Sequence, residues 1–570
     1  MPYNLKSQAQ DVWRIPLVGS YNSRTMDSST ASYTYSSTTA KDQRFINAIP
    51  TKVSTESTGA QKYYVSKRPG WESYITPSAG NVGNTLCYWA DVPVLISAFG
   101  SPTSTIYAES TSMGNISNQA MTMDWGRLGS TPYLAIRSYD STLWLITSPY
   151  TFSTTFTADT SNGVTTLTNV SSTTYRYVGQ AISGTGIQAG TRIVSIDSAT
   201  QITMSLPATA TNSGVTITHE IIQKVTDTDY PGNASRTITG NAVFMDDYLF
   251  VMDETGRIYN SDNGNFLSWT ALNYITAIAQ PDFGIGLARY KNTVMALGTN
   301  SIEFFRNVGN ELGSPLERMD QYQIKLGCVC ARGYTIVGDS IAWMGNNDEG
   351  GVAVYILNDF TPKRISTPEI EKQFSLSVGS NSVANGQVCF SNAFKVGGQT
   401  FISFTVLNNT FVYCLESELW FEMGGATVFW HNIASTGKGF LRTIYAQSVT
   451  STSGKIFKID PSNMVYQDNG VAYSMIVQTS KIDGENSLNK RLMRLRIIGD
   501  KATSTDSLSV SWSDDDYQNF STARTVDMSN ADPNLVACGN FRRRAFKFTH
   551  SANTPCRLEA IEMYVKQDMH

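Results

Sequence analysis

Charged residues, histidines and long apolar runs are all scarce in this sequence. Of its 570 residues only 16% are charged, and 43 basic against 47 acidic residues give a net charge of −4. A protein held to nucleic acid by bulk positive charge would be basic, so that class is excluded. Disorder is excluded as well, because 41% of the residues are hydrophobic and 11% are aromatic.

The chain also lacks the segments that target a protein to a membrane. No run of 18 uncharged apolar residues occurs, so we expect no membrane-spanning helix. The N-terminal residues 1–16 have no apolar core of the kind a signal peptide needs. We therefore expect synthesis in a reducing cytoplasm.

Cysteine and histidine are too few and too scattered to suggest a metal site. A disulfide framework would be dense and even in number, so we predict reduced, mostly buried thiols, including the Cys328-Val-Cys330 pair on one strand face. No histidine has a His or Cys neighbour at zinc-ligand spacing, and we expect no metal and no cofactor. These residues are Cys87, Cys328, Cys330, Cys389, Cys414, Cys538 and Cys556, and His219, His431, His550 and His570.

A repeated β pattern begins near residue 63, in a composition rich in Ser, Thr, Gly, Tyr and Phe. Each repeat consists of a hairpin with Gly, Asp or Asn at its turn, followed by a third strand of β-branched and aromatic residues. The third strands are predicted at 104–108, 142–146, 256–260, 301–305, 352–356, 410–414 and 455–459. Their first residues are 38, 114, 45, 51, 58 and 45 positions apart.

The long interval of 114 contains a segment of different composition, 151–222, made almost entirely of Thr, Ser, Val, Ile, Gly and Ala. Without it the interval returns to the length of the others. A period of 40–60 residues built from short antiparallel strands predicts a β-propeller, here of six or seven blades. A series of β-sandwiches is the alternative that this pattern leaves open.

The sequence thus predicts an all-β protein with five parts. One helix is expected to start at Ser366-Thr-Pro-Glu369, which has the form of a capping box, with Ile370 and Phe374 on one face. The parts are an extended N-terminal arm (1–62), the first propeller blades (63–150), an inserted small β domain (151–222), the remaining blades (223–468) and a C-terminal β-sandwich-like domain (469–570).

No motif in the chain predicts catalysis, and we expect no catalytic residues. The run Phe283-Gly-Ile-Gly-Leu-Ala-Arg289 lacks the third glycine of a dinucleotide-binding loop. The run Ser513-Asp-Asp-Asp-Tyr-Gln-Asn-Phe520 resembles the Asp-box hairpin of sialidase-like propellers, with Tyr517 in place of the glycine. Such a box stabilises a turn, and no pair of carboxylates is marked for glycoside hydrolysis.

Two groups of basic residues remain open to more than one interpretation. Lys67-Arg-Pro-Gly-Trp71 forms a compact turn that either anchors a blade edge or contacts a partner. The second group is expected either on a solvated strand face paired with acids such as Asp514 to Asp516, or on a surface that meets DNA phosphate or an acidic subunit. It comprises Arg494, Arg496, Arg542, Arg543, Arg544 and Lys547.

Two runs of the sequence resemble a known family. The first joins Asp42-Gln-Arg-Phe-Ile-Asn47 to Tyr63-Tyr-Val-Ser-Lys-Arg-Pro-Gly70. The second, stronger run extends over 290–375 and includes Ser301-Ile-Glu-Phe-Phe305 and Arg364-Ile-Ser-Thr-Pro-Glu-Ile-Glu371. In their order these motifs are similar to the tail hub or nozzle proteins of short-tailed, P22-like bacteriophages, the packaged DNA stabilization proteins.

The resemblance implies a non-enzymatic virion protein with a β-propeller. Six copies would form a tube below the portal and adaptor rings, which retains packaged DNA and conducts it at ejection. Tailspikes or fibres would dock on its flank, and a needle or plug would close its tip. The alternative function is a phage-borne propeller that binds or cleaves glycans, motivated by the Asp-box and the blade period.

Overall fold

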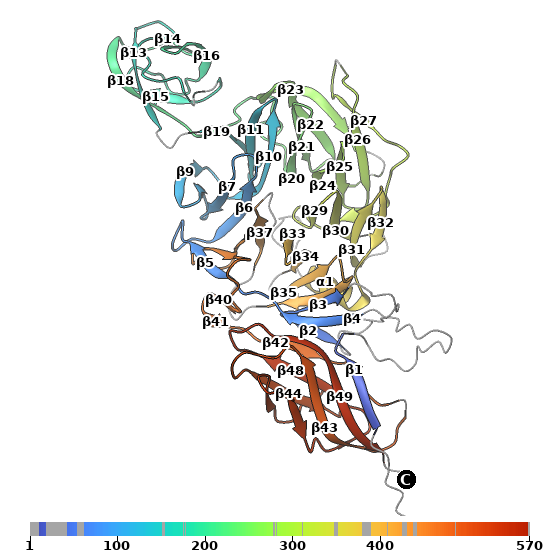
Figure 1. Cartoon of the computed structure of the whole chain (residues 1–570). Coiled ribbons are helices and arrows are strands. Elements are labelled where there is room, and N and C mark those ends of the chain that lie inside the picture. The colour runs from blue at the N-terminus through green and yellow to red at the C-terminus, as the bar shows by residue number, and fades with distance from the viewer. Residues whose placement is uncertain are drawn as a thin grey trace, which may run out of the picture.

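The chain is described here from a computed structural model, in which seven blades of antiparallel strands form a ring (Figure 1). The described residues are 11–18, 43–53, 62–150, 154–174, 176, 178–277, 280, 282–310, 312–346, 351–378, 389–406, 409–424, 430–436, 442–484 and 486–567. Most of the predicted N-terminal arm, His570 and parts of several loops lie outside these residues.

Each blade is an antiparallel meander whose first strand lies innermost, except that the last blade takes its outer strand from the N-terminal segment. Blade one consists of β6 (Gly83–Trp89), β7 (Val94–Phe99), β8 (Ser104–Ala108) and β9 (Thr111–Ile116). Blade two consists of β10 (Ala120–Leu128), β11 (Thr131–Ser138), β12 (Leu143–Thr147) and β19 (Ile222–Lys224). Blade three consists of β20 (Ile238–Met245), β21 (Tyr248–Asp253), β22 (Arg257–Asp262) and β23 (Asn265–Thr276). Blade four consists of β24 (Gly284–Tyr290), β25 (Thr293–Gly298), β26 (Ile302–Asn307) and β27 (Leu316–Arg318). Blade five consists of β29 (Tyr334–Val337), β30 (Ser340–Asn346), β31 (Val352–Asn358) and β32 (Thr361–Arg364), and the short strand β28 (Gly327–Cys328) also pairs with β30. Blades six and seven are β33 (Cys389–Val396), β34 (Gln399–Val406), β35 (Asn409–Cys414) and β36 (Leu419–Met423); and β37 (Asn432–Ser435), β38 (Ile444–Gln447), β39 (Ile456–Ile459) and β5 (Glu72–Ile75).

The ring closes through a strand from the beginning of the chain. Strand β5 pairs with β39, and the innermost strands β37 and β6 of the last and first blades are in contact. Within the described residues the propeller therefore has seven blades, one of the two numbers predicted. The seven predicted third strands coincide with β8, β12, β22, β26, β31, β35 and β39, which confirms the period.

Particular residues permit a tight hairpin turn within one blade and a close approach between two neighbouring blades. Asp246 and Asp247, at the turn between β20 and β21, both have positive φ, as a tight hairpin requires. Blades three and four join where β20 pairs with β24. There Gly240 has positive φ, and a Cβ on it would lie 2.2 Å from the Cα of Gly286, so no larger residue fits.

The inserted module lies between β12 and β19 of blade two and projects from the propeller (Figure 1). It has its own core, which includes Phe156, Leu167, Ile193, Ile202 and Ile217. Its two three-stranded sheets are β13 (Thr155–Thr160), β18 (Asn212–His219) and β15 (Ile182–Gly184), and β14 (Thr166–Leu167), β17 (Gln201–Met204) and β16 (Ile193–Ser198).

The C-terminal part forms a β-sandwich together with strands from the N-terminal segment. Leu495 and Ile561 of one sheet share a core with Val510 and Phe548 of the other. The first sheet contains β1 (Asp11–Pro16), β3 (Ala48–Val53), β4 (Lys62–Lys67), β49 (Arg557–Gln567), β43 (Lys490–Gly499), β46 (Asn534–Val536) and β47 (Asn540–Phe541). The second contains β2 (Arg44–Ile46), β42 (Met475–Gln478), β48 (Ala545–His550), β44 (Ser507–Ser513) and β45 (Arg524–Asp527). Strand β4 thus lies in the sandwich, although the sequence placed it with the first blades.

Strand β2 connects the sandwich directly to the propeller. It pairs in parallel with β36 of blade six at Ile46 and antiparallel with β42 of the sandwich. One nine-stranded sheet therefore runs from blade six into the sandwich. The predicted helix is present as α1 (Pro368–Val378), with Phe374 buried. Ser366 Oγ contacts the carboxylate of Glu371 at 2.6 Å, whereas the side chain of Glu369 lies outside the described residues.

Candidate functional site

The centre of the propeller is crossed by the side chain of Arg332, which precedes β29 of blade five. Its guanidinium donates to the backbone oxygens of Asn84, at 3.3 Å, and Met121, which belong to the inner strands of blades one and two on the opposite side of the ring. The carbonyl of Arg332 accepts hydrogen bonds from the backbone N–H and the hydroxyl of Ser391 in blade six, both at 2.9 Å. One residue thus joins four blades across the axis.

Hydrogen bonds also tie neighbouring blades together around the ring. Gln447 Nε2 of blade seven donates to Ala98 O of blade one, and the backbone N–H of Ala120 in blade two donates to Ser104 Oγ of blade one. The Tyr334 hydroxyl of blade five accepts from Asn241 N and donates to the carbonyl of Leu287, and so links three blades. The propeller is therefore a closed ring held by polar side chains at its centre.

Burial changes the protonation behaviour of the groups near this axis. Desolvation raises the pKa of Asp124 on β10 to about 7, although the Arg137 guanidinium and a backbone hydrogen bond with Ala242 act in the opposite direction. Desolvation also lowers the pKa of Arg137 and of Arg332. The hydrogen bonds that the buried guanidinium of Arg137 donates to two carbonyls of blade three, those of Gly240 at 2.6 Å and Ile238 at 2.9 Å, offset part of the cost of its desolvation. These bonds hold blades two and three together.

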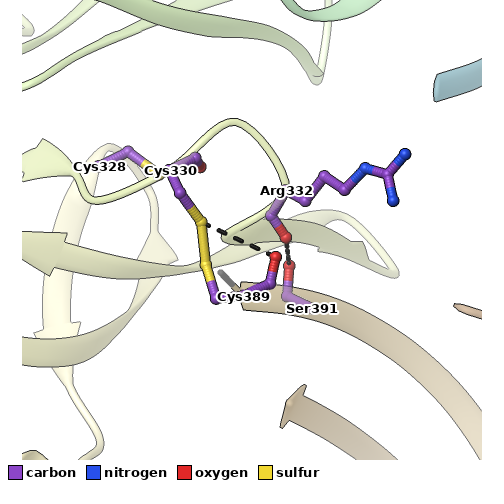
Figure 2. The surroundings of a disulfide bond; sticks show 5 residues. All are labelled: Cys328, Cys330, Arg332, Cys389 and Ser391. Carbon is purple, nitrogen blue, oxygen red and sulfur yellow. Dashed lines mark hydrogen bonds between the residues drawn. A yellow bond between two sulfur atoms is a disulfide. The ribbon is translucent and has the colours of Figure 1, made fainter. Parts of the chain in front are cut away.

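A disulfide between Cys330 and Cys389 links blades five and six beside Arg332, and it corrects the prediction that the thiols are reduced (Figure 2). The two cysteines are 59 residues apart and meet only because consecutive blades bring their inner ends together. Sequence spacing contains no signal for such a pair. Cys328 stays free, with its Sγ 3.4 Å from the carbonyl of Cys330.

The turn that begins at Lys67 is a buried anchor between the propeller and the sandwich. The guanidinium of Arg68 pairs with both carboxylate oxygens of Asp468, at 2.6 and 3.0 Å, and lies 3.9 Å from the ring centre of Tyr473. It also donates to the amide oxygen of Asn47 and the carbonyl of Gly424. Of the two interpretations that the sequence left open, the structure supports an internal anchor.

The predicted basic group divides into paired and unpaired members. Arg544 is buried, pairs with Asp514 at 2.7 Å and lies over the rings of Trp512 and Phe541. Arg494 and Arg496 pair with Asp532, and Arg496 also reaches Glu562. Arg542 and Arg543 are exposed, and the structure gives neither an ion pair within the described residues.

The Asp-box hairpin lies in the sandwich after β44 and not in a propeller blade. The carboxylate of Asp515 accepts from Ser513 Oγ and from the backbone and side-chain N–H groups of Asn519, and these bonds lower its pKa to about 2. Asp516 and Tyr517 both have positive φ. The hairpin is a stabilised turn, as predicted, and its position removes the link between the box and a sialidase-like propeller.

The histidines that the structure describes are buried and contact neighbouring side chains. His550 is buried and its Nε2 lies 2.8 Å from Asp506, while His219 contacts Gln180 and His431 packs on Phe390. No group of three or more His, Cys, Asp or Glu residues within the described ranges is arranged to hold a metal ion. Likewise, none of the described helices is long and apolar enough to cross a membrane.

Comparison with known proteins supports the family resemblance. Residues 147–424, which cover the inserted module and blades three to six, match the family model described as "Bacteriophage P22 Gp10, beta-propeller". This match confirms both the resemblance drawn from the sequence and the propeller fold, and it supports a structural role in a phage particle. The N-terminal strands and the sandwich lie outside the match.

Two further comparisons add little. No curated protein matches the sequence. Among solved structures, the chain is similar to the crystal structure of the computationally designed Ika8 protein, with 10% identity over 68% of this chain and 99% of that one. The TM-score is 0.32, which is too low to support any conclusion about fold or function.

Proposed function

We propose that this chain is the tail nozzle, or hub, subunit of a short-tailed bacteriophage. Six copies form a tube below the portal and adaptor rings, retain the packaged genome and conduct it at ejection. Tailspikes or fibres dock on the flank of the tube, and a needle or plug closes its tip. The chain is made in the host cytoplasm, resides in the virion tail and is not an enzyme.

The closed axis of the propeller is the observation that supports this arrangement most strongly. Because Arg332 joins blades one, two, five and six across the centre, a DNA duplex has no passage through a single propeller. A conduit built from this chain therefore has its lumen between copies, as a ring of subunits provides. Such a ring uses heterologous contacts that close.

The charge and the exposed surface are compatible with the same proposal. A net charge of −4 lets DNA slide along most of the surface without strong attraction. Several large apolar side chains of blades three and four are exposed, among them Leu272, Phe283 and Leu312. They are available to a neighbouring copy in a ring.

The test compares phage particles made with and without the chain. We expect heads that lack it to package DNA and then lose it, and we expect complementation in trans to restore both the filled heads and infectivity. Intact, DNA-filled and infectious particles formed without the chain would contradict the proposal. Stoichiometric incorporation, at six copies per tail, is the matching biochemical result.

The glycan alternative has lost one of the two features that motivated it, since the Asp-box hairpin belongs to the sandwich and only the blade period remains. It still predicts saccharide binding by the isolated chain. A flat glycan array, together with no loss of sugar polymer on incubation, would reject it.

A further inference from the structure

Four exposed cations gather at one end of the sandwich. Arg491 on β43 and Lys566 on β49 are directly opposed in the antiparallel register, and both are exposed while their sequence neighbours Leu492 and Val565 are buried. The two charged side chains therefore point out of the same face of the sheet. Figure 1 shows the C-terminal end of β49 at the end of the sandwich that lies away from the propeller.

Arg542 and Arg543 belong to the same cluster through strand β47. Arg491 is in register with Asn540 of β47, and the two arginines follow that strand directly. Lys490 holds the segment that carries these two arginines in place, because its buried ammonium donates to the carbonyls of Arg542 and Leu488 at 3.3 and 2.8 Å. The four side chains of Arg491, Arg542, Arg543 and Lys566 are called the basic end below.

The basic end differs from Arg494, Arg496 and Arg544 in lacking acidic partners. Arg494, Arg496 and Arg544 each form ion pairs with carboxylates, whereas none of the four basic-end side chains has one among the described residues. Like charges placed opposite each other in a sheet destabilise it. Four uncompensated cations in a chain of net charge −4 therefore indicate a surface that meets a negatively charged partner.

We propose that the basic end binds the phosphate backbone of duplex DNA, independently of base sequence. This inference rests on the proposed function, because a subunit that surrounds the genome has DNA as its neighbouring polyanion. Arginine forks match phosphate oxygens, and the side chains are exposed and free to follow a backbone. The basic end binds DNA at one position, while the remaining surface, which carries the net negative charge, attracts it little and allows it to move past.

The test measures binding of the purified full-length chain to a fluorescein-labelled duplex by fluorescence anisotropy, at salt concentrations between about 50 and 200 mM, the range over which phosphate binding weakens steeply. The variant replaces Arg491, Arg542, Arg543 and Lys566 with Gln. The control variant removes an equal number of positive charges, four, from exposed positions in the propeller region, through Arg289→Gln, Lys325→Gln, Lys372→Gln and Lys395→Gln.

We expect the basic-end variant to bind at least about tenfold more weakly, and the slope of log affinity against log salt to fall by about 0.9 for each phosphate that the variant no longer neutralises. The control is expected to bind within about twofold of wild type, and two duplexes of unrelated sequence are expected to bind equally. Equal weakening in both variants, or no binding of wild type at the lowest salt concentration, would overturn the proposal. Tighter binding of labelled poly-glutamate than of the duplex would assign the surface to an acidic protein and overturn it too.

This outcome is separable from the fate of the proposed function. Particles that need the chain to keep their DNA, combined with a basic-end variant that binds duplex like wild type, would reject only the inference about this surface. All four substitutions are at exposed positions, so unchanged thermal unfolding of the variant is expected and shows that it is folded.

Discussion

Removing the disulfide between Cys330 and Cys389 should weaken the propeller where blades five and six meet (Figure 2). The bond closes a loop of 59 residues, and the loop-entropy model then gives a stabilisation of about 4 kcal/mol through the unfolded state. We expect the variant with both cysteines changed to Ala to lose a large part of that amount. Its effect should be local, because Arg332 and its hydrogen bonds with Ser391 remain on the same seam.

Hydrogen exchange and alkylation provide the assay. Amides of β29 and β33 should exchange faster in the double variant than in wild type, and reductant should reproduce the effect in wild type alone. Cys328→Ala is the matched control, since it removes a buried neighbouring thiol and keeps the disulfide. Alkylation of the denatured wild-type chain should label five cysteines without reductant and seven with it.

Two results would refute this reasoning. Labelling of all seven cysteines without reductant would show that the disulfide is absent. Equal exchange at β29 and β33 in the double variant and in wild type would show that the disulfide does not hold the blade seam.

Three further predictions concern charged groups. Arg68→Met leaves the carboxylate of Asp468 buried without its partner, so we expect a loss of about 3–5 kcal/mol in the free energy of unfolding, measured with urea; adding Asp468→Asn should recover part of it, and an additive double variant would contradict the ion pair. Asp124 has a raised pKa, so the native state binds its proton more tightly than the unfolded state does. The free energy of unfolding should therefore fall as pH rises from about 4 to 7, by at most about 4 kcal/mol. Asp124→Asn should flatten this pH dependence in thermal unfolding measured across that range, and an unchanged slope would refute the prediction. Asp515 has a lowered pKa, so its contribution is present at neutral pH and is lost as pH falls toward about 2; Asp515→Ala should destabilise the chain at neutral pH and much less near pH 2, and an equal effect at both would be inconsistent with the turn hydrogen bonds.

The repeat could be predicted from the sequence because it depends on local chemistry. Each third strand has β-branched and aromatic residues at short range, as in Thr410–Cys414, and each hairpin has a turn signal such as Asp246-Asp247. The closure of the ring could not be predicted in the same way. Strand β5 pairs with β39 from the far end of the propeller sequence, and strand β4 leaves the blades for the sandwich. Such pairings are decided by packing between distant segments.

The candidate site was less accessible to sequence reasoning. Arg332 lies just after Cys330 in an ordinary loop sequence, and only the assembled ring reveals that it reaches Asn84 and Met121. The disulfide was missed for the same reason. Lys67–Trp71 was recognised as a distinct turn, but the carboxylate partner of its arginine is 400 residues away. The basic residues near 542 were recognised from their local density, whereas Arg491 and its cross-strand neighbour Lys566 were not.

Cryo-electron microscopy of the phage particle that contains this chain is the most direct test of the central claim. The account predicts six copies in a tube below the portal, with DNA density in the lumen between copies and protein density, including Arg332, along the axis of each propeller. One or three copies at the tip of a fibre, or DNA density running through the centre of a propeller, would contradict it.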